Sequence, residues 1–259
     1  MNVGERDELI MKLFLASLRS YGEIKFTGFN GKISSVGFRG EFRHVDPETI
    51  QLLPSLNDDQ LKNYAYSIGG CKAPTSAKSD IYINGRGVSL KSLRAAPPAL
   101  VNHTPRPGFH RVCGAVGSDI TILDGIVDEY WDLRMKGTIS EDTKITNPNC
   151  PFRNYKNYLK PILEYFLFTG TGSADSKYPA DFLLEFRDPL KIETWRMLNK
   201  DEAFESVWKN LVFSLRAKKG MPLDYSLYTY RRKNADSIAR WVRYCGNDYR
   251  GALHIRTTG

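Results

Sequence analysis

The chain has 259 residues, of which 41% are hydrophobic and 12% aromatic, and it carries a formal net charge of +8. This length and composition are those of a globular protein with a sizeable core, and they exclude a low-complexity chain. The longest apolar stretch, LIMKLFLASL, is interrupted by Lys12 and is too short to span a membrane, and the acidic N-terminal residues are unlike a signal peptide. Four widely scattered cysteines therefore favour reduced thiols and a cytoplasmic protein.

The first third of the chain alternates between helical and strand-like patterns. Apolar residues at helical spacing predict a helix over 5–19, and Gly22 ends it. Short strand-like pieces broken by glycines predict a small meander over 23–44. A second helix is expected over 58–68, followed by a loop over 71–78.

The stretch 79–92, SDIYINGRGVSLKS, predicts a β-hairpin. Asp80 opens an alternating run, glycines supply the positive φ that a tight turn requires, and a second strand runs back. Ser89 and Lys91 are two residues apart, so on a strand they share one face. The hairpin therefore places an acidic residue on one strand and a lysine on its neighbour.

Downstream of the hairpin, helices and strands are mixed. Proline-containing stretches at 95–98 and 105–108 predict loops. Helices are expected over 118–136, over 155–168 and from Asn234 to Gly246, and strands over 181–186, 211–216 and 252–256. This order predicts an α/β or α+β fold with a mixed central β-sheet flanked by helices, in a single domain over 1–259.

Positive charge is concentrated at the C-terminal end. The segment 205–259 contains eleven Lys or Arg residues against four acidic residues, with five tyrosines interleaved. Clustered positive charge mixed with aromatic side chains is typical of a surface that binds a polyanion, usually nucleic acid. The alternative is a basic face that serves only solubility.

The hairpin also carries residue types that phosphodiester hydrolysis requires. A carboxylate holds a divalent metal against the phosphate, and a nearby ammonium orients or deprotonates the attacking water or neutralises the developing charge. Asp80 followed by Ser89-Leu90-Lys91, after the loop 73–79, resembles the PD-(D/E)xK nuclease superfamily, and type II restriction endonucleases within it. The resemblance covers about residues 69–95. It implies a restriction-endonuclease-like core, with the catalytic part at about 46–136.

The resemblance implies a site-specific endonuclease that cuts duplex DNA with Mg²⁺. Asp80 would bind the metal, the backbone carbonyl of Leu90 would be a further ligand, and Lys91 would act on the water or on the transition state. Ser89 stands where the motif has a second acid, so it is assigned an auxiliary role. The missing carboxylate is then expected from a helix, with Glu8 as first candidate, followed by Glu48 and Asp119.

The expected DNA contacts come from two regions. One is the stretch after the hairpin and the other is the basic C-terminal part, and the candidates are Arg106, His110, Arg111, Arg216, Lys218, Lys219, Arg231, Arg232, Lys233, Arg240 and Arg243. A two-fold symmetric DNA site favours a homodimer. The alternative function is a noncatalytic DNA- or RNA-binding protein that uses the basic C-terminal third.

Two other interpretations concern smaller motifs. His103, His110 and Cys113 bring zinc-ligand types within eleven residues, but without the spacing of compact zinc sites or a fourth ligand. Asp80 and Lys91 also have a purely structural interpretation, as a turn residue and a solvated lysine at a sheet edge.

Overall fold

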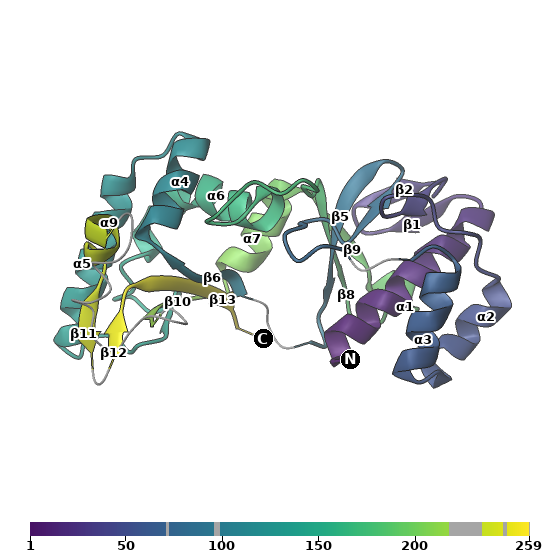
Figure 1. Ribbon diagram of the computed structural model, residues 1–259, viewed down its shortest axis with the longest axis horizontal. Helices are drawn as coiled ribbons and strands as arrows, with labels where there is room; N and C mark the ends of the chain where they lie inside the picture. Colours follow the sequence, from purple (N-terminus) through teal and green to yellow (C-terminus); the bar gives the residue numbers. More distant parts are fainter. Residues whose placement is uncertain (71–72, 96–98, 218–234, 246–247, 259) are drawn as a thin grey trace. The chain divides into compact units, whose positions relative to one another are not determined.

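The computed structural model describes residues 1–70, 73–95, 99–217, 235–245 and 248–258. Its contacts divide the chain into two compact units. Unit 1 consists of Met1–Ala96 and Ser176–Ala203, and unit 2 of Pro97–Asp175 and Phe204–Gly259. Figure 1 shows the chain in the colours of the sequence, in which the green segment 176–203 belongs to unit 1 together with the purple and blue N-terminal part. The sequence predicted a single domain, whereas unit 1 is discontinuous, and the expected catalytic core at 46–136 crosses its boundary.

A five-stranded mixed sheet organises unit 1, in the order β3-β4-β5-β8-β9. Its strands are β3 (Val36–Gly37), β4 (Ile81–Ile83), β5 (Arg86–Ser92), β8 (Phe182–Phe186) and β9 (Arg196–Leu198). Neighbouring strands are antiparallel except for β5 and β8, which are parallel with Val88 opposite Phe182. The mixed sheet and its helices confirm the predicted fold class.

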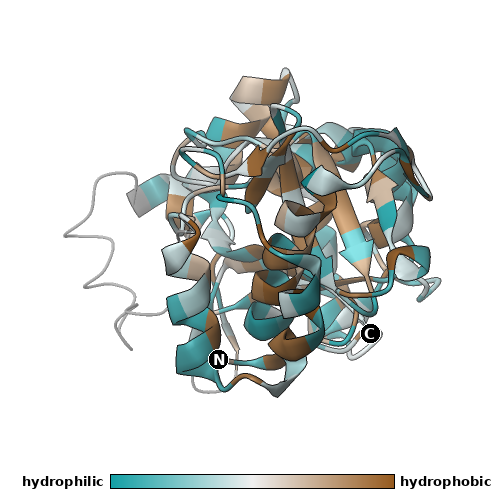
Figure 2. Cartoon of the chain, turned by 90° about the vertical axis from the view of Figure 1, so that its right-hand side faces the viewer, coloured by the Kyte–Doolittle hydropathy of each residue, from teal (hydrophilic) through white to brown (hydrophobic). Residues whose placement is uncertain are grey.

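Helices cover this sheet. They are α1 (Val3–Ser17), α2 (Pro47–Leu52) and α3 (Asp58–Ser67), and a small ribbon, β1 (Ile24–Phe26) with β2 (Phe29–Gly31), lies between α1 and β3 in sequence. Helix α1 begins with a capping box between Asn2 and Glu5, and its buried stripe packs against β5 and α3. Figure 2 views the chain from the side of α1, α2 and α3, whose ribbons carry both hydrophobic and hydrophilic residues. One face of each helix can therefore be buried while the other meets water.

The predicted hairpin is confirmed. Strands β4 and β5 pair antiparallel with Ile83 opposite Arg86, which leaves Asn84 and Gly85 as the two turn residues. Both have positive φ, at 50° and 77°, as the tight hairpin turn requires. The side-chain oxygen of Asn84 also accepts a hydrogen bond from the backbone N–H of Ser34 at 2.8 Å. This bond ties the turn to the chain that precedes β3.

Unit 2 is built on an antiparallel sheet with the order β6-β13-β10-β7. The strands are β6 (Ala99–Pro105), β7 (Thr143–Lys144), β10 (Leu211–Arg216) and β13 (Ala252–Thr257), and a separate ribbon joins β11 (Arg243–Cys245) to β12 (Asp248–Arg250). The helices are α4 (Arg106–Val116), α5 (Ile120–Met135), α6 (Lys156–Glu164) and α9 (Ala235–Ala239). Helix α6 contains Pro161 and continues as a π-helix over Tyr165–Thr169. Helix α7 (Lys200–Trp208) begins in unit 1 and ends in unit 2.

Two local predictions for unit 2 are wrong. The loop expected at 105–108 is the start of α4, because a proline in the first helical turn lacks only an N–H that has no helical partner there. The helix expected from Asn234 to Gly246 ends at Ala239, and the chain then enters β11. Ile238 and Trp241, which the helical pattern places at core spacing, are nevertheless buried. Packing of these side chains and the pairing of β11 with β12 thus override the helical pattern.

Candidate active site

Asp80 is held against the strand that carries Lys91. It lies just before β4, its backbone N–H donates to the carbonyl of Val88 at 2.9 Å, and its Oδ2 accepts from the backbone N–H of Leu90 at 2.8 Å. The Oγ of Ser89 lies 3.3 Å from the same carboxylate oxygen. Ser89 is buried and thus supports Asp80 through a hydrogen bond, which fits its predicted auxiliary role. The hairpin register therefore fixes the orientation of one carboxylate.

Lys91 lies near the end of β5 and is half-buried. Its neighbour in the parallel register is Glu185 of β8, which is 8% exposed. Adjacent residues in register project from the same face of a sheet, so this pairing brings a second acidic side chain beside the lysine. Glu185 also forms an ion pair with Arg196 at 3.7 Å. The sequence predicted a strand that contains Glu185, but nothing in the sequence indicated that this strand pairs with β5.

Glu8 of α1 is electrostatically coupled to this hairpin. Burial and the negative charge of Asp80 raise the pKa of Glu8 from 4.5 to about 7, against smaller lowering effects of Lys91 and Lys12. Two carboxylates that share a site resist simultaneous ionisation, and a bound cation relieves that cost. Glu48 is exposed on α2, and Asp119 caps α5 in unit 2, where its oxygens accept from Thr121. Glu8 is therefore the candidate that the electrostatics connect to Asp80.

Lys78 is a further member of the site that sequence reasoning missed. Burial and the positive charge of Lys91 lower the pKa of Lys78 from 10.5 to about 8, and Asp80 opposes that shift. Its backbone N–H donates to the carbonyl of Tyr178 at 2.9 Å, which anchors the chain just before Asp80. The only signal in the sequence was its spacing of two residues from Asp80, which is too common to be informative.

The donor set is compatible with magnesium. Within the described ranges, no group of three or more His, Cys, Asp or Glu side chains is arranged to hold a metal ion. Mg²⁺ commonly uses only one or two carboxylates and completes its octahedron with waters and substrate phosphate oxygens. Asp80 and Glu8 supply two carboxylates, and the carbonyl of Leu90 lies on the strand that Asp80 contacts.

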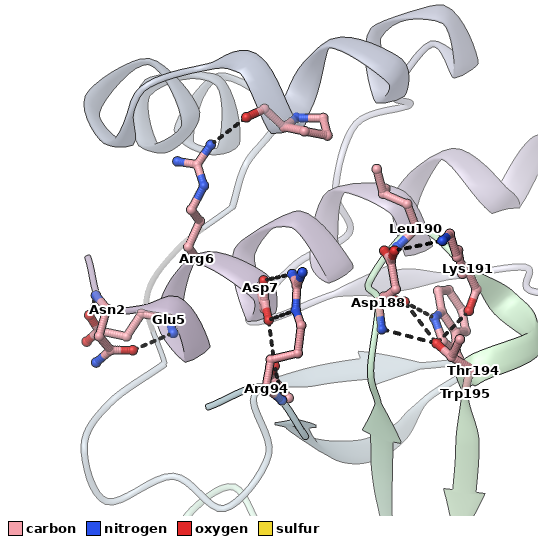
Figure 3. A network of polar contacts seen from close by, with 12 residues as sticks. Asn2, Glu5, Arg6, Asp7, Arg94, Asp188, Leu190, Lys191, Thr194 and Trp195 are labelled. Carbon is pink, nitrogen blue, oxygen red and sulfur yellow. Dashed lines mark hydrogen bonds and ion pairs between the residues drawn. The ribbon is translucent and has the colours of Figure 1, made fainter. Parts of the chain in front are cut away.

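The buried carboxylate of Asp7 fixes α1 to the strand that carries Lys91 and to the residues just after it. Asp7, 2% exposed, accepts from the Oγ of Ser92 at 2.5 Å and from the Nε of Arg94 at 3.1 Å. Figure 3 shows the guanidinium of Arg94 lying against both carboxylate oxygens of Asp7. Asp7 precedes Glu8, and Ser92 follows Lys91. This clamp therefore joins the two segments that bear those site residues.

Loss of the clamp should destabilise the fold. Asp7→Ala removes the acceptor for Ser92 and Arg94, and since the Arg94 side chain is half exposed, water can solvate it. We expect a loss of about 1–3 kcal/mol in the free energy of unfolding, measured by urea titration. The control is Asp59→Ala, because Asp59 is exposed and pairs with Lys62 only at the surface, at 3.7 Å. Equal urea midpoints for the two variants would contradict a structural role for the clamp.

Arg106 belongs to the interior of unit 2. Its Nε and Nη2 each donate to a different oxygen of Asp124 at 2.7 Å, and its Nη1 donates to the Oγ of Ser237 at 2.8 Å. The Nε1 of Trp241 adds a further hydrogen bond to Asp124 at 2.7 Å. With 17% of its side chain exposed, Arg106 is committed to this network, which argues against the predicted contact with DNA.

Other predicted DNA contacts are also paired within unit 2. Arg111 forms an ion pair with Asp175 at 2.9 Å, and Arg216 with Asp142 at 2.7 Å. Arg240 and Arg243 both pair with Asp128, the latter at 3.4 Å. These four side chains are partly exposed, so binding a phosphate would require exchange of a carboxylate partner. His110 is exposed on α4. Lys218, Lys219, Arg231, Arg232 and Lys233 lie outside the described residues.

Breaking the Arg106 network should affect folding more than DNA binding. Arg106→Ala removes two hydrogen bonds from the buried Asp124 carboxylate and leaves it the hydrogen bond from Trp241 and the more distant charge of Arg240. We therefore expect a loss of about 3–5 kcal/mol in the free energy of unfolding. Arg243→Ala, at an exposed ion pair, should cost about 1 kcal/mol or less. An Arg106→Ala protein with wild-type stability but weakened DNA binding would show that this arginine contacts DNA after all.

The zinc interpretation gains no support from the geometry. His103 lies on β6, where its ring meets that of His254 with centroids 4.8 Å apart, whereas Cys113 is buried in the core of unit 2 near Tyr158. Cys113, Cys150 and Cys245 are free thiols, consistent with the expected absence of disulfides among the described cysteines.

Comparison with known proteins assigns this chain to no family. No protein-family model, curated protein or solved structure matches this chain. Across the described part of the chain, none of the helices has the length and apolar character needed to cross a bilayer.

Proposed function

We propose that this chain is a Mg²⁺-dependent deoxyribonuclease that hydrolyses phosphodiester bonds of duplex DNA, as a site-specific endonuclease of the type II restriction kind. The observation that carries the proposal is the hydrogen-bonded placement of Asp80 against the strand of Lys91, within reach of whose charges Glu8 and Lys78 lie in unit 1. Burial, together with the charges of Asp80 and Lys91, shifts the pKa values of Glu8 and Lys78, and titratable groups with shifted pKa values cluster at catalytic sites. Strand β5 lies between β4 and β8, so Lys91 is not on an edge strand of its sheet.

Each residue of the cluster has a role in this reaction. Asp80 and Glu8, with the carbonyl of Leu90, would hold Mg²⁺, which when bound lowers the pKa of a water molecule and offsets charge on the phosphate. Lys91 places an ammonium beside Asp80, where it attracts the phosphate and stabilises the charge that develops on it. Because the pKa of Lys78 is about 8, a substantial fraction of the molecules has an unprotonated Lys78 amine at pH 8. This amine can accept a proton from water.

Digestion of unmethylated phage DNA with Mg²⁺ tests the proposal directly. A site-specific endonuclease produces discrete bands on a gel, and EDTA abolishes them. A smear indicates cleavage without sequence choice, which would retain the nuclease and remove the restriction specificity. Intact but retarded DNA would contradict the nuclease and favour the noncatalytic binding protein.

The proposed partner is double-stranded DNA, which a homodimer of this chain would bind. Two copies of the site, related by a two-fold axis, would cut both strands of a symmetric sequence. Sedimentation of the protein with and without a DNA duplex measures this assembly. A monomer in both conditions would contradict the homodimer and leave the chemistry of a single site in place.

A further inference from the structure

A pocket of about 360 Å³ lies between α1 and α3 in unit 1. Much of its wall is apolar, contributed by Leu9, Leu13, Phe42, Ala65, Tyr66 and Ile68. Charged residues also line it, with Glu5, Glu8 and Lys12 from α1 and Lys62 from α3. The volume is that of a small-molecule site, and the mixed lining suits a ligand that is partly flat and apolar and partly charged.

The pocket and the candidate active site share Glu8. Glu8 lines the pocket, and the hydrogen bond from Ser92 to the preceding residue, Asp7, holds this part of α1 against the end of β5 that carries Lys91. A ligand in the pocket is therefore adjacent to the place where a phosphodiester would be cut. Because the pocket adjoins the candidate active site, its expected ligand is a part of the nucleic-acid substrate itself.

The side chains around the pocket fit a nucleotide. Tyr66 is 61% exposed and offers a ring on which a base can stack, and Lys12 and Lys62 supply cations for backbone phosphates. A nucleobase is a flat heteroaromatic ring that fits an apolar slot, while its phosphates require positive charge nearby. A purely aliphatic ligand would make no use of the two lysines.

We propose that this pocket receives a nucleobase of the DNA strand next to the cleaved phosphodiester, turned out of the base stack. This inference rests on the proposed nuclease function and extends it to the shape of the substrate. Extrusion of a base costs least where the nucleotide is mismatched or already unpaired. The enzyme should therefore bind DNA more tightly when an unpaired nucleotide lies beside the cleavage site.

Free mononucleotides test the pocket without any need for cleavage. Deoxyadenosine and thymidine monophosphates are titrated into the full chain, and their binding is measured by isothermal titration calorimetry. We expect saturable binding that Tyr66→Ala weakens about tenfold to a hundredfold, since that is the range for loss of one stacking partner. Tyr21→Ala is the matched control, because Tyr21 is 46% exposed and does not line the pocket. Absence of saturable binding up to about 10 mM would overturn the proposal.

DNA that contains 2-aminopurine provides the second readout. The Lys91→Ala variant is used so that the DNA stays intact, and the fluorescent base is placed at each position of the bound sequence in turn. We expect a rise in fluorescence at one position, lost in Lys91→Ala/Tyr66→Ala and kept in Lys91→Ala/Tyr21→Ala. No rise at any position of bound DNA would reject the extruded base while leaving cleavage by the wild-type protein, and so the proposed function, intact. A protein that binds mononucleotides at Tyr66 but never cuts DNA would instead retain the pocket and reject the nuclease.

Discussion

Asp80→Ala and Lys91→Ala should each reduce DNA cleavage by about three orders of magnitude, the scale seen when one preorganised electrostatic group is removed from an active site. Both residues act on the reacting phosphate in the proposed mechanism, and neither is needed for docking the duplex. DNA binding, measured by gel retardation, should therefore change little. Cleavage rates come from single-turnover assays on a DNA fragment with Mg²⁺.

Conservative variants separate chemistry from folding at these positions. Asp80→Asn keeps an oxygen that accepts from the N–H of Leu90 but removes the charge, so it should be as inactive as Asp80→Ala and better folded. Asp181→Asn is the matched control. Asp181 also accepts from a backbone N–H of β5, that of Gly87, at 2.9 Å. Lys91→Arg should also be poor, since a planar guanidinium replaces a compact ammonium. Near wild-type cleavage by Asp80→Asn would remove Asp80 from the site.

Glu8→Gln should weaken the binding of Mg²⁺ and stabilise the metal-free protein. The pKa of Glu8 is raised to about 7 in the fold, so the folded state retains a proton that the unfolded chain releases above pH 4.5. Stability of the wild type is therefore lost as pH rises from about 4.5 to about 7, and glutamine avoids this loss. We expect Glu8→Gln to gain about 1–3 kcal/mol at pH 8 in EDTA and almost nothing at pH 4.

The same variant is expected to require more Mg²⁺ for half-maximal cleavage, because one carboxylate ligand has become a neutral amide. Urea unfolding at the two pH values and a Mg²⁺ titration of cleavage measure the two effects separately. Glu48→Gln is the control, since Glu48 is exposed on α2. An unchanged Mg²⁺ titration for Glu8→Gln would exclude Glu8 as a metal ligand. An unchanged stability would show that its carboxyl is not held at a raised pKa.

Local signals account for the parts of the site that the sequence predicted. The Asn84-Gly85 turn fixes the hairpin register, and the register places Asp80 against Leu90. Glu8 was named as one of three candidates because a carboxylate was missing, and only its electrostatic coupling to Asp80 distinguishes it. Glu185 could not be predicted, because it reaches Lys91 through a parallel pairing across more than ninety residues. Such pairings leave no trace in the periodicity of either strand.

For the basic residues, the sequence does not reveal which side chains are already paired within the fold. Arg106 was predicted to contact DNA from its position after the hairpin, and Arg216 and Arg240 from charge density, yet each has a carboxylate partner within unit 2. A count of charges cannot distinguish an arginine that is committed to an aspartate from one that is available to a phosphate. The relevant partners lie on other elements, and their proximity depends on tertiary packing.

The parallel pairing of β5 with β8 has a consequence for biosynthesis. The segment 97–175 lies between these strands in the chain and belongs to unit 2, so it leaves the ribosome after Asp80 and Lys91 and before Glu185. A nascent or truncated chain that ends before Ser176 therefore carries the hairpin with one side of β5 as an open sheet edge. Such edges pair readily with other chains, so truncated chains should aggregate and not assemble the candidate active site.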